Sequence, residues 1–287
     1  MILYYLFYNV TGVIMELITS KNNPKAVRVS KLLQKKYRGE YGEYIVCGKK
    51  LTEEASLANM KAESIFVTDI FFEKNGAFCR DIFKTVGENA ELYMASCEVM
   101  KKMSGEDAPD GILCVFKCTD NSEKISSVYS NSLCNGIKGG IVIFDSVRDP
   151  GNMGTAIRSA YAFGIGLIIA SPDCADIYSP KVQRGAMGAS FGQSVMVQDT
   201  KKTVKELKEA GFSVYAAALH QNSTDITDVK IDEKTAFVIG NEGSGLSDDV
   251  ISLCSGCVII PIKEHSESLN AAVAASIIMW EMGKSFG

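Results

Sequence analysis

Two polar side chains beside a glycine-rich turn could bind a ligand. Asn152 and Arg158 lie six residues apart across the start of a predicted helix, and glycines occupy positions 151 and 154. Glycine lets the backbone approach a ligand or a substrate phosphate closely, because no Cβ fills the space. An amide and a guanidinium near such a turn can donate hydrogen bonds to the same ligand. A simple phosphate-binding turn is the alternative interpretation.

Two further blocks carry polar residues at similar places. Glu242 is the centre of an Asn-Glu-Gly turn that follows the apolar run 236–239. Ser268 and Asn270 precede an alanine-rich helix, which either side chain could simply cap. All three blocks follow apolar, strand-like runs, and ligands bind at such strand ends in open α/β sheets. The chain lacks the glycine patterns of P-loop and dinucleotide sites, so ordinary nucleotide binding is disfavoured.

Residues 138–287 are predicted to form the α/β domain that positions these blocks. The predicted strands are the apolar runs 140–144, 166–170, 194–197, 213–217, 235–239 and 257–260. The predicted helices are 152–163, 203–210 and 270–283. Nearly continuous apolar strands separated by helices indicate a mostly parallel sheet that is covered on both faces.

Residues 15–117 are predicted to form a smaller α/β domain, in which strands again alternate with helices. Its expected strands are 44–47, 64–68, 91–94 and 111–116. Residues 118–137 are rich in Ser, Asn, Asp and Lys and lack a firm period, so they are the expected linker.

Residues 1–14 form an apolar and aromatic stretch of doubtful origin. No Lys or Arg precedes Lys21, whereas a signal peptide has a positively charged start. The stretch is also shorter than the roughly 20 apolar residues of a membrane-spanning helix. We expect Met15 to be the natural start and no membrane association. A weakly ordered extension or an added edge strand is the alternative.

The composition favours a cytoplasmic protein without a metal. Nine cysteines are scattered along the 287 residues without the spacing of a disulfide framework, as is typical of reduced thiols. Cys254 and Cys257 form the only CxxC pair, and the chain has only two histidines. A zinc site would need two more ligands, so structural thiols are expected instead.

One segment is strongly basic, although the net charge of the chain is -4. Seven cationic residues occur without an acid between them: Lys21, Lys25, Arg28, Lys31, Lys35, Lys36 and Arg38. Such a patch can bind RNA phosphates, although it can equally be a solvated helix face. The same two alternatives hold for Lys181 and Arg184 in the second domain.

The three blocks together resemble the signature motifs of the TrmH/SpoU branch of the SPOUT methyltransferases. The matching segments are 144–154 with Arg158, 239–246, and 260–262 with 268–270. Segments 18–24, 35–38 and 42–48 resemble the SpoU-type substrate-binding domain that precedes many such catalytic domains. Cys47 departs from that pattern, since the family usually has Glu there. The resemblance covers nearly everything from Met15 on.

The resemblance implies a fold, an activity and partners. The fold would be a parallel SPOUT-type sheet with a deep trefoil knot, preceded by a smaller α/β RNA-binding domain. The activity would be S-adenosylmethionine-dependent methylation of a ribose 2′-hydroxyl, with ribosomal RNA as the expected substrate. Family members are homodimers through the C-terminal domain, so the same assembly is expected here.

The resemblance also implies site residues. The expected catalytic residues are Asn152, Arg158, Glu242, Ser268 and Asn270. The expected cofactor-binding residues are Ala217, Ala218, Leu219, Ile239, Gly240, Asn241, Gly243, Ile260 and Leu269. The expected RNA-binding residues are Lys21, Arg28, Lys35, Lys36, Arg38, Lys181 and Arg184.

The chemistry leaves two roles open for Arg158. In the family the matching arginine is the proposed general base. A guanidinium has a pKa above about 12, however, so it can instead stabilise the developing alkoxide or clamp the adjacent phosphate. A non-catalytic RNA-binding protein that keeps the fold is the alternative function. A dehydrogenase is disfavoured by the missing glycine fingerprint.

Overall fold

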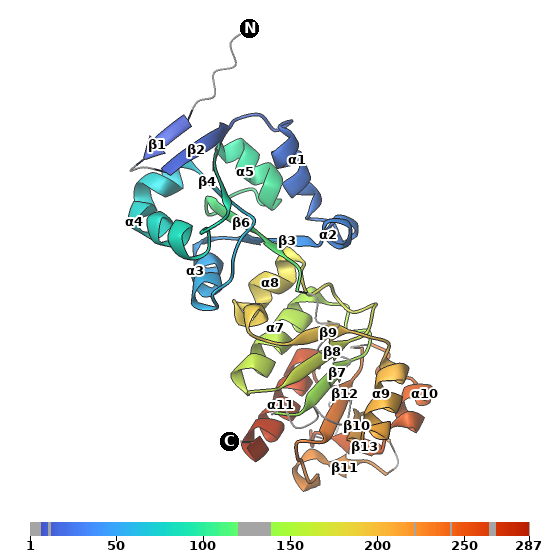
Figure 1. Ribbon diagram of the computed structural model, residues 1–287. Helices are drawn as coiled ribbons and strands as arrows, with labels where there is room; N and C mark the ends of the chain where they lie inside the picture. Colours follow the sequence, from blue (N-terminus) through green and yellow to red (C-terminus); the bar gives the residue numbers. More distant parts are fainter. Residues whose placement is uncertain are drawn as a thin grey trace. The chain divides into compact units, whose positions relative to one another are not determined.

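The computed structural model describes residues 7–10, 13–119, 139–220, 222–241, 243–263 and 268–286. The chain divides into two compact units, Met1–Thr119 with Tyr178–Arg184, and Asp120–Ile177 with Gly185–Gly287. Each unit has its own sheet (Figure 1). No helix among these residues is long and apolar enough to cross a membrane.

The sheet of the first unit is mixed. Its described strands are β1 (Phe7–Val10), β2 (Val13–Ile18), β3 (Glu43–Cys47), β4 (Ser64–Val67), β5 (Glu91–Ala95) and β6 (Ile112–Lys117). They are ordered β1-β2-β5-β4-β6-β3. The neighbours β2, β5 and β4 run parallel, and the other pairs are antiparallel. The four strands predicted for this region are confirmed to within about one residue at each end.

Strand β1 forms the edge of this sheet. Its Phe7 pairs with Glu16 of β2, and β2 pairs with β5 through residues 16–18. The backbone at 7–10 therefore adopts the edge strand that was the alternative interpretation of this stretch. Where the natural chain starts stays a prediction.

Helices pack beside the first sheet. They are α1 (Pro24–Lys31), α2 (Lys35–Tyr41), α3 (Lys49–Leu57), α4 (Asp69–Thr85) and α5 (Cys97–Ser104). The side chains of Thr68 and Ser96 accept hydrogen bonds from the backbone at the starts of α4 and α5. One core joins α1 and α5 to the sheet, with Val29, Met100 and Phe66 all buried in it.

The sheet of the second unit is wholly parallel among the described strands. These are β7 (Ile141–Phe144), β8 (Leu167–Ala170), β9 (Val195–Val197), β10 (Ser213–Ala217), β11 (Thr224–Asp225), β12 (Thr235–Ile239) and β13 (Gly256–Ile259). They are ordered β11-β13-β10-β12-β7-β8-β9. The six predicted strands and the parallel arrangement are confirmed. The two-residue β11 was missed, because so short a strand leaves no apolar period.

Helices cover both faces of the second sheet. They are α7 (Pro150–Ala162), α9 (Thr200–Glu209), α10 (Asp248–Leu253) and α11 (Ala271–Phe286). Most of a further helix, α8 (Pro180–Ala186), lies in the segment assigned to the first unit. Figure 1 shows α7 and α11 on one side and α9 and α10 on the other. Ile141 and Ile143 of β7 share a core with Val204 of α9 and Val250 of α10. Alternate strand residues thus face opposite helix layers, which explains the nearly continuous apolar runs.

Candidate active site

Four neighbouring strands end at the same level of the second sheet. Phe144 of β7 pairs with Ile239 of β12, Ile239 pairs with Ala217 of β10, and Ala217 pairs with Val258 of β13. Because the strands are parallel, the loops that follow them leave from one edge of the sheet, the edge formed by the carboxyl ends of the strands. The three sequence blocks follow β7, β12 and β13, so the fold brings them to a common edge, as ligand sites in open α/β sheets require.

The loop after β7 is fixed by a network of hydrogen bonds. Ser146 has a positive φ of 58°, and its N–H donates to Ser171 Oγ at 2.8 Å. Its hydroxyl donates to Asp173 at 2.6 Å, and Arg148 forms a 3.0 Å ion pair with the same carboxylate. Hydrogen bonds from Ser146, Ser171 and Arg148 lower the pKa of Asp173 well below its usual range.

Sequence reasoning missed Asp173. It lies beyond β8, outside all three blocks, and nothing in its neighbourhood marks it as a site residue. Its two partners, Arg148 and Ser146, belong to the first block. Both are hydrogen-bond donors that need an acceptor, and this need was the only feature of the sequence that pointed to a residue such as Asp173.

Asp149 begins α7 and orients its first turn. Its side chain accepts a hydrogen bond from the N–H of Asn152 at 2.8 Å, and Pro150 occupies the first turn. Gly154 is buried, and a Cβ on Gly185 would lie 3.2 Å from its Cα. At position 154, the predicted close approach is therefore between two segments of the protein backbone, at Gly154 and Gly185, and not between backbone and a ligand.

Asn241 organises the loop after β12. Its side-chain amide donates to the carbonyl of Ser146 at 2.7 Å, and its Oδ1 accepts from the N–H of Gly243 at 2.9 Å. A Cβ on Gly240 would lie 2.5 Å from the carbonyl carbon of Gly245, so only glycine allows this fold of the loop. Asn241 thus joins the second block to the first. Glu242, predicted as catalytic, lies outside the described residues.

Asn270 joins the third block to the first. Its Oδ1 accepts hydrogen bonds from the N–H groups of Ala272 and Val273 at the start of α11. Its Nδ2 donates to Asn152 Oδ1 at 2.9 Å. The capping interpretation is confirmed, and the same side chain also contacts Asn152 of the first block.

Arg158 and Ser268 are exposed. Arg158 projects from α7, and within the described part of the chain its guanidinium has no hydrogen bond or ion pair. The next residue, Ser159, has its hydroxyl 2.8 Å from that of Ser276, which fixes α7 against α11. The helix that carries Arg158 is thus held in place while the side chain stays open to solvent.

The predicted cofactor residues lie at the strand ends. Ala217 and Ile239 are the last residues of β10 and β12, and the N–H of Ala218 donates to the carbonyl of Val258 at 3.2 Å. Ile260 and Leu269 are half-buried. Leu219 is 89% exposed, so an apolar side chain lies open to solvent at this edge. Ile262, 42% exposed, is a second such residue, which belongs to the third block but was not among the predicted cofactor residues.

The structure corrects the role expected for Arg38. The residue is only 5% exposed, and its guanidinium donates to the carbonyl of Leu32 at 2.6 Å. Its burial among the helices of the first unit gives it a structural task, because a buried charge needs a nearby acceptor. Arg38 therefore cannot present its charge to RNA.

Much of the remaining basic segment is neutralised by acids. Lys21 pairs with Glu98 at 2.8 Å, and Arg28 pairs with Glu43 at 3.0 Å. Lys35 and Lys36 are exposed at the start of α2. The patch is thus smaller than the sequence indicated.

The two cations predicted further along the chain are both exposed. Arg184 forms a 2.6 Å ion pair with Glu106 inside the first unit, whereas Lys181 lies at the start of α8. Among the described residues no group of three or more His, Cys, Asp or Glu side chains could hold a metal ion.

Comparison with protein families identifies both parts of the chain. Residues 140–280 match the SpoU rRNA Methylase family, and residues 23–114 match the MRM3-like substrate binding domain. The chain belongs to the SpoU methylase family. The first match contains all three blocks, and the second contains most of the first unit.

Individual relatives support the same assignment over nearly the whole chain. The 23S rRNA (guanosine(2553)-2'-O)-methyltransferase RlmP of Bacillus subtilis is 29% identical over 93% of this chain and 99% of its own. The crystal structure of an rRNA methyltransferase from Sinorhizobium meliloti superimposes with a TM-score of 0.79, at 26% identity over 94% of this chain and 98% of that one. Its AdoMet-bound form superimposes with a TM-score of 0.77, at the same identity and coverage.

Proposed function

We propose that this protein transfers a methyl group from S-adenosylmethionine to a ribose 2′-hydroxyl of 23S ribosomal RNA. The observation that carries the proposal is the meeting of the three SpoU blocks at one sheet edge. Asn241 joins the second block to the first and Asn270 joins the third to the first, through hydrogen bonds of 2.7 and 2.9 Å. The likeness to an enzyme that methylates 23S rRNA supports the choice of substrate.

The edge fits the proposed cofactor. Leu219 and Ile262 expose apolar surface there, and the adenosyl group of S-adenosylmethionine is a flat, largely apolar partner for it. The residues that would hold the cofactor are Ala217, Ala218, Leu219, Ile239, Gly240, Asn241, Gly243, Ile260 and Leu269. The bound group supplies a methyl already activated by its sulfonium, so the protein mainly has to position the ribose hydroxyl in line with it.

The proposed catalytic groups are Arg158, Asn152, Glu242, Ser268 and Asn270. A ribose hydroxyl is a poor nucleophile, because it holds its proton tightly near neutral pH. The solvent-open guanidinium of Arg158 would stabilise the developing alkoxide or clamp the neighbouring phosphate. Asn152 and Asn270 would orient the ribose, since the hydrogen bond between them fixes the rotamers of both amides.

We also propose the homodimer, the knot and the domain limits that the family implies. Tyr161, Val273 and Trp280 are each about half exposed on α7 and α11, and clustered apolar side chains mark interaction surfaces. Light scattering should give twice the mass of one chain, and Trp280→Glu should lower the measured mass to that of the monomer.

The knot would be formed by the C-terminal segment. The domains would be residues 15–117 and 138–287, with 118–137 as a linker, and the protein would be cytoplasmic.

The function is tested by methylation of protein-free 23S rRNA with radiolabelled S-adenosylmethionine, followed by mapping of 2′-O-methyl groups. One ribose should gain a methyl group, and Arg158→Ala should lower the rate of this methylation roughly a hundredfold. RNA binding without methyl transfer by the intact protein would instead favour the non-catalytic RNA-binding alternative. Calorimetric titration with S-adenosylmethionine separates loss of catalysis from loss of the cofactor site.

A further inference from the structure

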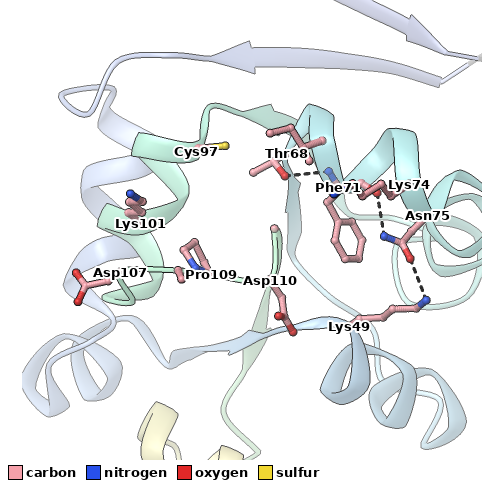
Figure 2. Close-up of a pocket in the computed structure, with 13 residues that line it drawn as sticks. Lys49, Thr68, Phe71, Lys74, Asn75, Cys97, Lys101, Asp107, Pro109 and Asp110 are labelled. Atoms are coloured by element: carbon pink, nitrogen blue, oxygen red, sulfur yellow. Dashed lines mark hydrogen bonds between the residues drawn. The ribbon is translucent and has the colours of Figure 1, made fainter.

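The first unit contains a pocket of about 610 Å³ that the proposed chemistry does not use. Helix α4 contributes most of one wall, and α5 and the loop before β6 contribute the other (Figure 2). Its lining residues are Lys49, Thr68, Ile70, Phe71, Lys74, Asn75, Cys97, Lys101, Asp107, Ala108, Pro109, Asp110 and Gly111. All of them lie within the match to the MRM3-like substrate binding domain.

The lining combines apolar surface with charges of both signs. The rings of Phe71 and Pro109 lie on opposite sides of the hollow in Figure 2. Ile70 adds apolar surface that is 50% exposed. Three lysines and two aspartates surround this apolar surface. A flat group could therefore be held on the apolar walls, with its polar edge at the carboxylates and an attached anion at the ammonium groups.

Helix α4 is kinked beside the pocket. Asn75 has φ -127° and ψ 30° in the middle of α4, which kinks the helix. Its amide donates to the carbonyl of Phe71 at 3.1 Å, and its Oδ1 accepts from Lys49 Nζ at 2.9 Å. This arrangement holds Lys49 beside the pocket, and departures from regular helix tend to occur at functional sites.

We propose that this pocket binds an unpaired nucleotide of the RNA substrate, which makes it the contact that selects the RNA. The nucleotide chemistry matches the lining: a base has two apolar faces and a polar edge, and its phosphate is an anion. Lys74 has no ion pair within the described residues, so its exposed ammonium group is open to a phosphate. Lys49, which donates to Asn75, and Lys101, which forms a 3.6 Å ion pair with Glu98, flank the same hollow, so Lys74 is the cation on which the proposal depends.

This proposal rests on the proposed function, because it takes RNA as the substrate. It is supported by the loss of free cations in the basic segment, residues 21–38. Arg38 is buried, and Lys21 and Arg28 are paired with acids. The substrate-binding domain therefore needs further contacts beyond that segment to hold RNA. The pocket is a concave site on the same domain that offers both cations and stacking surface.

The test measures binding of protein-free 23S rRNA by the full-length protein. Ile70→Ala combined with Lys74→Ala changes two exposed side chains, so the fold should be retained. We expect the Kd to rise about tenfold, because the variant removes both apolar surface beneath the base and one cation that contacts phosphate. The slope of log K against log salt should fall by about 0.7, the value for one lost phosphate contact with a single strand. S-adenosylmethionine affinity should be unchanged.

Lys84→Ala is the matched control, because Lys84 is an exposed lysine near the other end of α4 and outside the pocket. Bound RNA should also protect Lys74, but not Lys84, from acetylation detected by mass spectrometry. An unchanged Kd in the double variant, or equal acetylation of both lysines with RNA bound, would overturn the pocket proposal. A wild-type protein that binds RNA through Lys74 but transfers no methyl group would overturn only the proposed function.

Discussion

Asn152 and Asn270 are joined by a 2.9 Å hydrogen bond although 118 residues separate them in the chain. Asn152 lies in the first turn of α7, and Asn270 caps α11. The bond connects the starts of two helices that pack on the same face of the sheet, so both amides point to the edge where the loops gather. Removing either amide should disturb the geometry of the other.

Asn270→Ser should separate capping from positioning. Serine caps helices nearly as well as asparagine, so the free energy of unfolding should change by only a few tenths of a kcal/mol. The shorter side chain loses the contact with Asn152, and methylation should fall about tenfold. Asn270→Ala, which also loses the cap, should cost about 1 kcal/mol of stability in urea unfolding. Equal activity in Asn270→Ser and the wild type would show that the bond has no role in catalysis.

Arg158 should act mainly on the transition state. Arg158→Ala should lower turnover roughly a hundredfold, as loss of one preorganised donor does, with S-adenosylmethionine affinity intact. Arg158→Lys distinguishes the two roles across a pH series. If the residue serves as a base, the turnover of Arg158→Lys should recover as the pH rises. If it clamps the phosphate through the planar guanidinium, the turnover of Arg158→Lys should stay low at every pH. Near-normal turnover by Arg158→Ala would remove the residue from the catalytic set.

Asp173 should stabilise the loop after β7 only while it is ionised. Hydrogen bonds from Ser146 and Ser171 and the Arg148 ion pair lower its pKa in the folded protein. Its contribution is therefore complete above the unfolded pKa of about 3.9 and is lost as the pH falls toward the folded pKa. Asp173→Asn should be less stable than the wild type by a constant amount from about pH 5 to 8, and this gap should narrow below about pH 4.

That comparison uses urea unfolding of both proteins across the pH range. If the difference in free energy of unfolding between the wild type and Asp173→Asn grew as the pH fell, it would contradict the assigned cause of the pKa shift. Because Asn241 donates to the carbonyl of Ser146, Asp173→Asn should also weaken S-adenosylmethionine binding, measured by calorimetry at neutral pH.

The basic segment should contain both binding and structural cations. Arg38→Gln should destabilise the fold by about 1–3 kcal/mol, because the buried carbonyl of Leu32 loses its donor. Lys36→Gln, an exposed change two residues earlier, should leave stability unchanged and weaken RNA binding severalfold at low salt. Thermal unfolding and filter binding separate the two effects. Equal stability of both variants would contradict the structural role of Arg38.

The sequence by itself determined the strand pattern, the fold class and the family. Apolar runs such as 141–144 and 235–239 are local signals, and burial on both faces makes them continuous. The glycines and asparagines that end these runs are also local, since loop geometry restricts which residues can occupy it. This is why the three blocks could be recognised before their arrangement was known.

Only the tertiary structure decided which side chains meet and which charges stay exposed. The Asn152–Asn270 bond depends on the packing of two helices, and the network around Asp173 depends on β7 and β8 being neighbours. Arg38 reads as one more surface cation until the fold places the Leu32 carbonyl beside it. Contacts of this kind follow from strand order and helix packing over long separations, which no local period of the sequence encodes.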